Sequence, residues 1–107
     1  MTASTVCLTL IAGRMLRQEL FDYLTEQNDI VSGFTASDAA GHGPAVRLHT
    51  AAERVKGHGD QVIIRIILQD DAARQLLGRL KTAFAGAHLV FWMTPVAEFG
   101  TLDDGIW

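Results

Sequence analysis

Hydrophobic and polar residues alternate in two segments of the chain, which is the two-residue period of a β-strand. Residues 5–11 place Val6, Leu8 and Leu10 on one face. Residues 61–68 read QVIIRIIL, so that both faces carry aliphatic side chains. This second segment is expected to be a central strand, covered on both sides.

Two other segments repeat apolar residues every three or four positions, as amphipathic helices do. Residues 14–27 place leucines on one side: Leu16, Leu20 and Leu24. After Asp70 a longer run follows the same rule: Ala73, Leu76, Leu77, Leu80 and Phe84. We expect Asp70 to be the N-cap of this second helix, and Asp71 to favour its start because the helix dipole is positive there.

Two more strands are predicted on either side of an irregular region. Residues 30–40 follow a turn signal and are rich in small side chains, which is typical of an edge strand, and residues 88–94 (HLVFWMT) form an apolar final strand. Between them, about residues 40–59 hold four glycines and three of the four histidines. We interpret this region as a long functional loop with a short helix at residues 50–56.

The resulting order is strand, helix, strand, long loop, strand, helix, strand. This order predicts an α+β, ferredoxin-like βαββαβ sandwich with a four-stranded antiparallel sheet. Two helices can cover only one face of such a sheet, so the other face would expose an apolar patch: Cys7, Ile11, Ile63, Ile67, Val90 and Trp92. Since a soluble monomer rarely exposes so large a patch, we expect the sheet to be buried against other subunits.

Length and composition exclude several classes of protein. A chain of 107 residues, 49% hydrophobic and 20% charged, fits one folded domain over residues 1–107. A net charge of −3 with scattered basic residues does not favour nucleic acid. The single cysteine, Cys7, permits no intrachain disulfide, and neither a signal peptide nor a membrane-spanning stretch is evident, so the protein is expected to be cytoplasmic.

Three stretches resemble the PII-like (GlnB-like) superfamily: residues 32–43 (SGFTASDAAGHG), 48–71 (LHTAAERVKGHGDQVIIRIILQDD) and 91–102 (FWMTPVAEFGTL). More narrowly, they resemble an uncharacterised subgroup often encoded beside heavy-metal efflux transporters. The resemblance implies a homotrimer with inward-facing sheets, and a regulatory or sensor role. It also implies that the loop between the second and third strands reaches a protein partner such as a metal-efflux transporter.

The usual PII ligands are ATP or ADP with 2-oxoglutarate, and most of that site is missing from this sequence. Residues 41–43 (GHG) resemble the family's Gly-x-Gly at the base of the loop, but Pro44 stands where a basic residue usually follows. Residues 82–88 lack the glycine-rich, lysine-containing phosphate loop, and residues 96–101 lack the usual pair of arginines. Because a triphosphate needs several positive charges, the sequence does not favour ATP or ADP.

Two Gly-His-Gly triplets flank the long loop, and a hairpin would bring His42 and His58 together. The candidate ligand site at the loop base is therefore the following set: Gly41, His42, Gly43, Gly57, His58 and Gly59. Imidazole suits divalent transition metals, and His49, Asp60 or a residue of a neighbouring subunit could complete the coordination. The alternative hypothesis is a metal-binding tolerance protein, although turn geometry alone also explains the flanking glycines.

The remaining candidates have simple structural explanations. Cys7 is expected to be a small buried hydrophobe or, alternatively, a soft-metal ligand at a trimer axis. Trp92 is assigned to packing, His88 to a strand boundary, and the tail at residues 102–107 is expected to fray or to dock on a neighbour.

No catalytic motif is present, so the chain is not expected to be an enzyme. One enzymatic alternative is kept: a small ferredoxin-like monooxygenase with an apolar pocket between helices and sheet, lined by His42 or Trp92.

Overall fold

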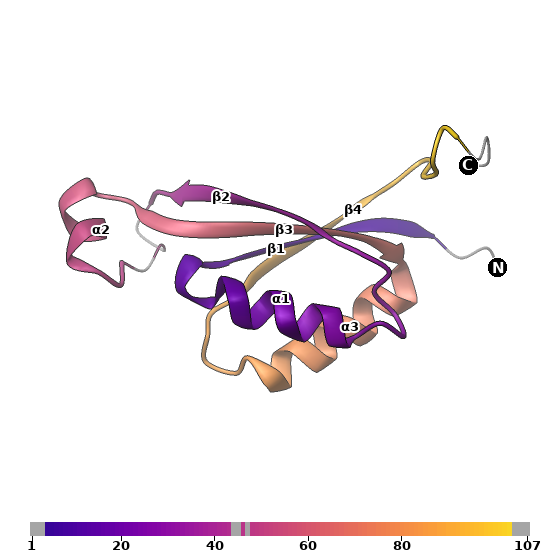
Figure 1. The fold of residues 1–107 in the computed structure, drawn as a ribbon, viewed down its shortest axis with the longest axis horizontal. Helices are drawn as coiled ribbons and strands as arrows, with labels where there is room; N and C mark the ends of the chain where they lie inside the picture. The colour runs from indigo at the N-terminus through magenta and orange to yellow at the C-terminus, as the bar shows by residue number, and fades with distance from the viewer. Residues whose placement is uncertain (1–3, 44–45, 47, 104–107) are drawn as a thin grey trace.

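The computed structural model describes residues 4–43, 46 and 48–103. The elements in chain order are β1 (Thr5–Gly13), the 3-10 helix η1 (Arg14–Leu16), α1 (Arg17–Glu26), β2 (Thr35–Gly41), α2 (Ala51–Lys56), β3 (Gly59–Gln69), α3 (Asp70–Ala83) and β4 (Val90–Pro95). The strands form an antiparallel sheet in the order β2-β3-β1-β4. Figure 1 shows α1 and α3 on one face of this sheet and α2 beyond its end. The predicted ferredoxin-like α+β fold is confirmed.

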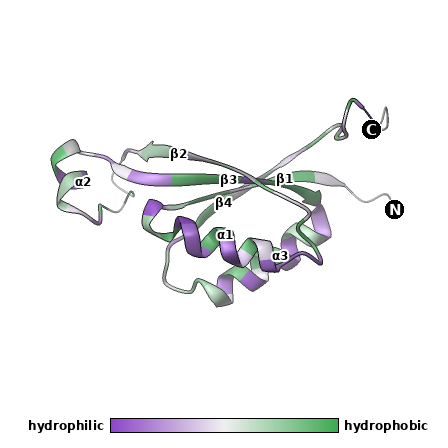
Figure 2. Ribbon diagram, in the orientation of Figure 1, coloured by the Kyte–Doolittle hydropathy of each residue, from purple (hydrophilic) through white to green (hydrophobic). Residues whose placement is uncertain are grey.

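The core lies between the sheet and the pair formed by α1 and α3. β1 and β3 are the central strands, and their register sets Leu8 opposite Ile66 and Leu10 opposite Ile64, all with almost no exposed surface. The helices contribute the buried residues that the spacing predicted: Leu20, Leu24, Ala73, Leu76 and Leu80. Figure 2 shows the alternation of hydrophobic and hydrophilic residues along both helices. Burying these aliphatic side chains drives the chain to this fold.

The face of the sheet away from α1 and α3 has no helix over it, as expected. Cys7 pairs with Ile67, and Ile11 lies between Ile63 and Val90. Within one chain the four residues of β1 and β3 on this face, Cys7, Ile11, Ile63 and Ile67, are half-buried. The two residues of β4 are more exposed: Val90 is 54% exposed and Trp92 is 45% exposed. The expectation that β3 is covered on both sides is therefore not met within one chain. We call this surface (Cys7, Ile11, Ile63, Ile67, Val90 and Trp92) the open face.

The strand predicted at residues 30–40 begins later than expected, at Thr35. The amides of Ile30 and Val31 donate to the Gln27 carbonyl at 3.1 and 2.8 Å, so these residues form a turn after α1. Val31 is buried in the core from this turn. Arg79 of α3 donates to both carboxylate oxygens of Asp29 at 2.9 and 2.8 Å. This charge-assisted contact joins the turn to α3.

The start of α3 also differs from the prediction, because Gln69 rather than Asp70 is the N-cap. The Asp70 amide donates to the Ser4 carbonyl at 2.8 Å, and its carboxylate pairs with Arg74 at 3.3 Å. Asp70 is therefore the first helical residue, where its charge still favours the helix start.

Two other boundaries shift for conformational reasons. The helix predicted at residues 14–27 opens with the 3-10 turn η1, and α1 proper begins at Arg17. The final strand begins at Val90, because His88 has a φ of 57° that no strand residue adopts.

Candidate functional site

The loop begins and ends at one point, where β2 stops and β3 starts. Gly41 and Gly59 are opposite each other at the end of the β2–β3 ladder. A side chain at Gly41 would collide with Gln61, since a Cβ there would lie 2.4 Å from its terminal atoms. The end of the Gln61 side chain would therefore have to move if any larger residue replaced Gly41.

His42 and His58 are brought together at this point, as the sequence predicted. Their ring centroids are 5.2 Å apart and the ring planes are inclined at 54°. His42 is exposed and His58 is half-buried. The pair offers two imidazoles on the surface, side by side, at the base of the loop.

The loop helix α2 is held in place by Glu53, which sequence reasoning did not single out. Its side chain is 3% exposed, and one carboxylate oxygen accepts from the amides of His49 and Thr50 at 2.7 and 3.0 Å. The other oxygen accepts from the Asp60 amide, at the start of β3. These hydrogen bonds hold the pKa of the Glu53 carboxyl below its ordinary value, and the bond from the Asp60 amide has the largest effect.

A signal for Glu53 was present in the sequence. Thr50 and Glu53 have the spacing of a capping box, and the Glu53 amide donates to the Thr50 hydroxyl at 3.1 Å. The helix then ends at Gly57, whose φ of 78° is readily adopted only by glycine. The short helix predicted at residues 50–56 is confirmed.

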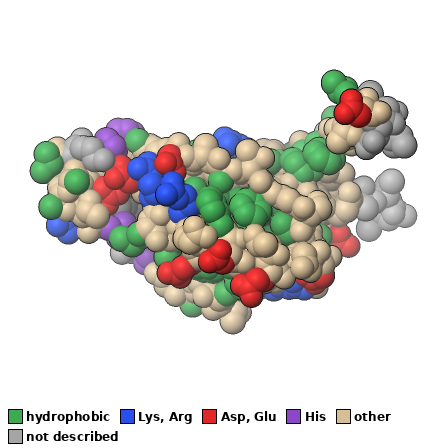
Figure 3. Space-filling view, viewed as in Figure 1, with side chains coloured by type: hydrophobic (Ala, Val, Ile, Leu, Met, Phe, Trp, Pro, Cys, Tyr) green, Lys and Arg blue, Asp and Glu red, His purple; other side chains and the backbone are tan. Residues whose placement is uncertain are grey.

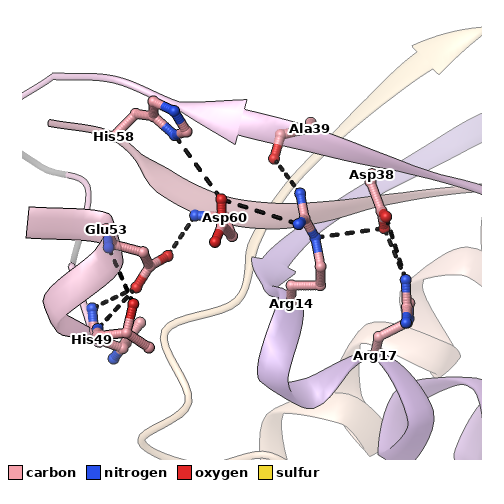
Figure 4. A network of polar contacts seen from close by, with 9 residues as sticks. Arg14, Arg17, Asp38, Ala39, His49, Glu53, His58 and Asp60 are labelled. Carbon is pink, nitrogen blue, oxygen red and sulfur yellow. Dashed lines mark hydrogen bonds and ion pairs between the residues drawn. The ribbon is translucent and has the colours of Figure 1, made fainter. Parts of the chain in front are cut away.

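A chain of polar contacts runs from His58 through Asp60 to Arg14 of η1 (Figure 4). His58 Nδ1 lies 3.9 Å from the Asp60 carboxylate, which lies 3.9 Å from Arg14. Arg14 also approaches Asp38 at 3.5 Å and donates to the Ala39 carbonyl at 3.1 Å. In Figure 3, acidic and basic side chains lie side by side in the region between α2 and α1, and histidines lie nearby. The loop base is thus coupled electrostatically to β2 and α1.

His49 does not join the histidine pair. It lines a small cavity of about 250 Å³ with Arg14, Glu53 and Asp60. Across residues 4–43, 46 and 48–103, no three His, Cys, Asp or Glu side chains are grouped so that they could hold a metal ion. Among the described residues, the pair His42 and His58 therefore has no third side chain of these types placed beside it for metal coordination.

The other candidates lie elsewhere. Cys7 is half-buried on the open face, where its Sγ is 3.9 Å from the Thr9 hydroxyl. His88 precedes β4, consistent with a boundary residue, and Trp92 is on the open face. Pro44 and residues 104–107 of the tail lie outside the described residues. An apolar cavity exists between α3 and β4, but neither His42 nor Trp92 lines it, contrary to the expectation for the enzymatic alternative.

The family of this chain follows from its comparison with known proteins. The model of a family described as "Protein of unknown function (DUF3240)" matches residues 2–103. A DUF3240 family protein from Shewanella baltica OS155 has a similar structure, with a TM-score of 0.73 and 18% sequence identity over 94% of this chain and 98% of that chain. No curated protein matches.

A second solved structure is CPII from Thiomonas intermedia K12, a nitrogen regulatory PII-like protein bound to ADP, AMP and bicarbonate. Its TM-score is 0.67, with 16% identity over 94% of this chain and 98% of that chain. At such low identity the likeness shows a shared fold and does not carry the ligands across. In addition, none of the helices in the described part of the chain is of a length and apolarity that would cross a bilayer.

Replacing Glu53 with Gln should release α2 from the start of β3. The amide has one acceptor oxygen and two N–H donors, which would face the backbone donors that now bind the carboxylate. We expect hydrogen exchange at the amides of His49, Thr50 and Asp60 to accelerate at neutral pH, measured by NMR. Arg54→Gln, an exposed neighbour on the same helix, is the control and should leave these rates unchanged.

The same contact has a defined pH dependence. Because folding lowers the pKa of Glu53, its contribution to stability is complete above the ordinary carboxyl pKa of about 4.5 and is lost as the pH falls through the lowered value. In wild-type protein the protection factors of these amides, which correct for the base-catalysed intrinsic rate, should stay high from pH 7 to about pH 5 and fall as the pH drops through the lowered pKa, whereas those of Glu53→Gln should be low throughout. Equal rates in both proteins would show that the carboxylate does not hold the loop.

Proposed function

Because the chain belongs to the DUF3240 family and has the fold of a nitrogen regulatory PII-like protein, we propose that it is a PII-like regulatory binding protein. Residues 1–107 would form a single domain that binds a small ligand at the loop base and presents the loop to a protein partner. The observation that carries this proposal is the meeting of two Gly-His-Gly triplets at the foot of α2.

The contacts around Asp60 provide a route from ligand to loop. Asp60 faces His58 and Arg14 with its carboxylate and binds Glu53 through its amide. A ligand that draws His58 away would alter the charge balance at Asp60, and Asp60 is bonded directly to the carboxylate that holds α2. Binding at the base would therefore change the order of the loop, as a sensor requires.

We infer that the assembly is a homotrimer formed through the open face. The exposed side chains of Val90 and Trp92 adjoin the half-buried Ile11 and Ile63, which makes an apolar surface over β1, β3 and β4. Burial of such a surface contributes about 25 cal/mol per Å² to association. The subunit number comes from the resemblance to PII-like proteins.

The cellular setting is part of the same proposal. A PII-like regulator would act in the cytoplasm, without catalysis, and the resemblance to proteins encoded beside efflux transporters suggests such a transporter as the loop's partner. The described fold has no membrane-spanning helix, which fits a regulator that docks on its target.

A second candidate function is direct binding of a divalent transition metal by the histidine pair. Among the described residues the buried His58 Nδ1 has no hydrogen-bond partner, and the Asp60 carboxylate lies 3.9 Å from it, close enough to hydrogen-bond the imidazole after a small shift. A neighbouring subunit or water would have to supply the further ligands that tetrahedral sites need.

For the regulatory proposal, we expect AMP, ADP or bicarbonate to raise the thermal midpoint and to slow hydrogen exchange at residues 48–60. At a hundredfold excess over Kd, one bound ligand stabilises by about 2.7 kcal/mol, which is a shift of several degrees. His42→Ala should reduce this shift, and Arg74→Ala, whose partner Asp70 follows the opposite end of β3, should retain it. Unchanged midpoints and exchange with all three probes would contradict the proposal.

For the trimer, Ile63→Asp should give a folded monomer, because the carboxylate would lose its hydration on association. Multi-angle light scattering should report three chains for wild type and one for the variant. Val55→Asp, at an 87% exposed position on α2, is the matched control and should keep the trimeric mass. A trimeric Ile63→Asp protein, or a monomeric wild type, would rule out this interface.

For the metal candidate, calorimetric titration with zinc, cobalt, nickel and copper(I) should give a Kd below about 1 mM for wild type. The double variant with His42→Ala and His58→Ala should lose this binding, while His49→Ala should keep it. Binding that persists in the double variant would place the metal elsewhere.

A further inference from the structure

A cavity of about 710 Å³ lies between the C-terminal half of α3 and β4, away from the loop base. Its walls are mainly apolar: Leu10, Leu77, Leu80, Phe84, Leu89 and Phe91. Phe84 is held edge to face against Tyr23 of α1, with ring centroids 5.4 Å apart. One wall of the cavity is therefore formed in advance of any ligand, and its volume is in the range of small-molecule sites.

Lys81 is the charged side chain that lines this cavity. Lys81 and His88 line it, and no carboxylate does, although the whole chain has a net charge of −3. Within the described part of the chain Lys81 has no ion-pair partner, whereas Arg14, Arg17, Arg74 and Arg79 each have at least one. An unpaired ammonium beside apolar walls is complementary to an anionic group on an apolar body.

Gly78 provides an independent indication. It lies in the interior of α3, where glycine is less favourable than alanine, and it lines the cavity. A Cβ at this position would have no heavy atom within 4 Å, so packing does not demand glycine. The position therefore has room for a side chain at the cavity wall.

The backbone at the cavity edge is also unusual. Across the described residues, His88 is the one non-glycine residue with a positive φ, at 57°. This conformation is costly, and such residues cluster where a ligand is clamped. It brings His88 to the cavity beside Leu89.

We propose that this cavity binds a small organic acid that has one carboxylate and an aromatic or aliphatic body. The body packs between Phe84, Phe91 and the leucines, and the carboxylate pairs with Lys81 near His88. The site is separate from the histidine pair at the loop base and does not depend on the function proposed for it.

The probe is 4-phenylbutyrate, with 4-phenylbutan-1-ol as its uncharged counterpart, titrated by calorimetry against the full chain. The acid should bind with a Kd below about 1 mM and the alcohol roughly tenfold more weakly. Lys81→Met should weaken the acid roughly tenfold and leave the alcohol unchanged. Arg74→Met, on the same helix but remote from the cavity, is the matched control and should alter neither.

Gly78→Phe should abolish binding of both probes, because its side chain enters open space and fills the cavity without disturbing the helix. Circular dichroism and light scattering would verify that this variant keeps its fold and mass. Any of three results would overturn the proposal. The first is no binding of the acid up to about 10 mM, the second is binding that neither Lys81→Met nor Gly78→Phe weakens, and the third is displacement of the acid by AMP or ADP. A changed mass in Gly78→Phe would also overturn it, because the cavity would then be a contact between chains.

Discussion

The antiparallel ladder between β2 and β3 positions every group that the proposed function uses. It ends at the pair Gly41 and Gly59, so the first and last residues of the loop are held together whatever lies between them. Because backbone hydrogen bonds set this register, His42 and His58 become neighbours without any direct bond between their side chains. The loop base is therefore a product of strand pairing, and its geometry is as rigid as the sheet itself.

The two faces of the sheet differ in what they pack against. One face packs against α1 and α3 and supplies most of the hydrophobic stabilisation of a single chain. The open face keeps partly exposed aliphatic and aromatic side chains, which is a surface for association. Stability of the fold and assembly are thus separated by the alternation of side chains along β1 and β3.

Polar contacts connect the loop to this scaffold. Glu53 joins α2 to the start of β3, and Asp60 joins that same point to His58 and Arg14. Ion pairs as long as 3.9 Å on a partly solvated surface contribute little stability, but they are easily rearranged by a ligand. The cavity at α3 and β4 is different, since its apolar walls are already in place and Lys81 lacks a partner among the described residues.

By itself, the sequence determined the order of elements, the covered and open faces, and the proximity of the two histidines, because strand and helix periods and the Gly-His-Gly spacing are local signals. Only the tertiary structure decided the role of Glu53, whose partner Asp60 is seven residues away and on another element. It also decided the turn at Ile30, the left-handed His88 and the cavity beside Gly78. The contact of Glu53 and the cavity depend on packing between different elements, whereas the turn at Ile30 and the φ of His88 are backbone conformations; hydrophobic periodicity reports neither.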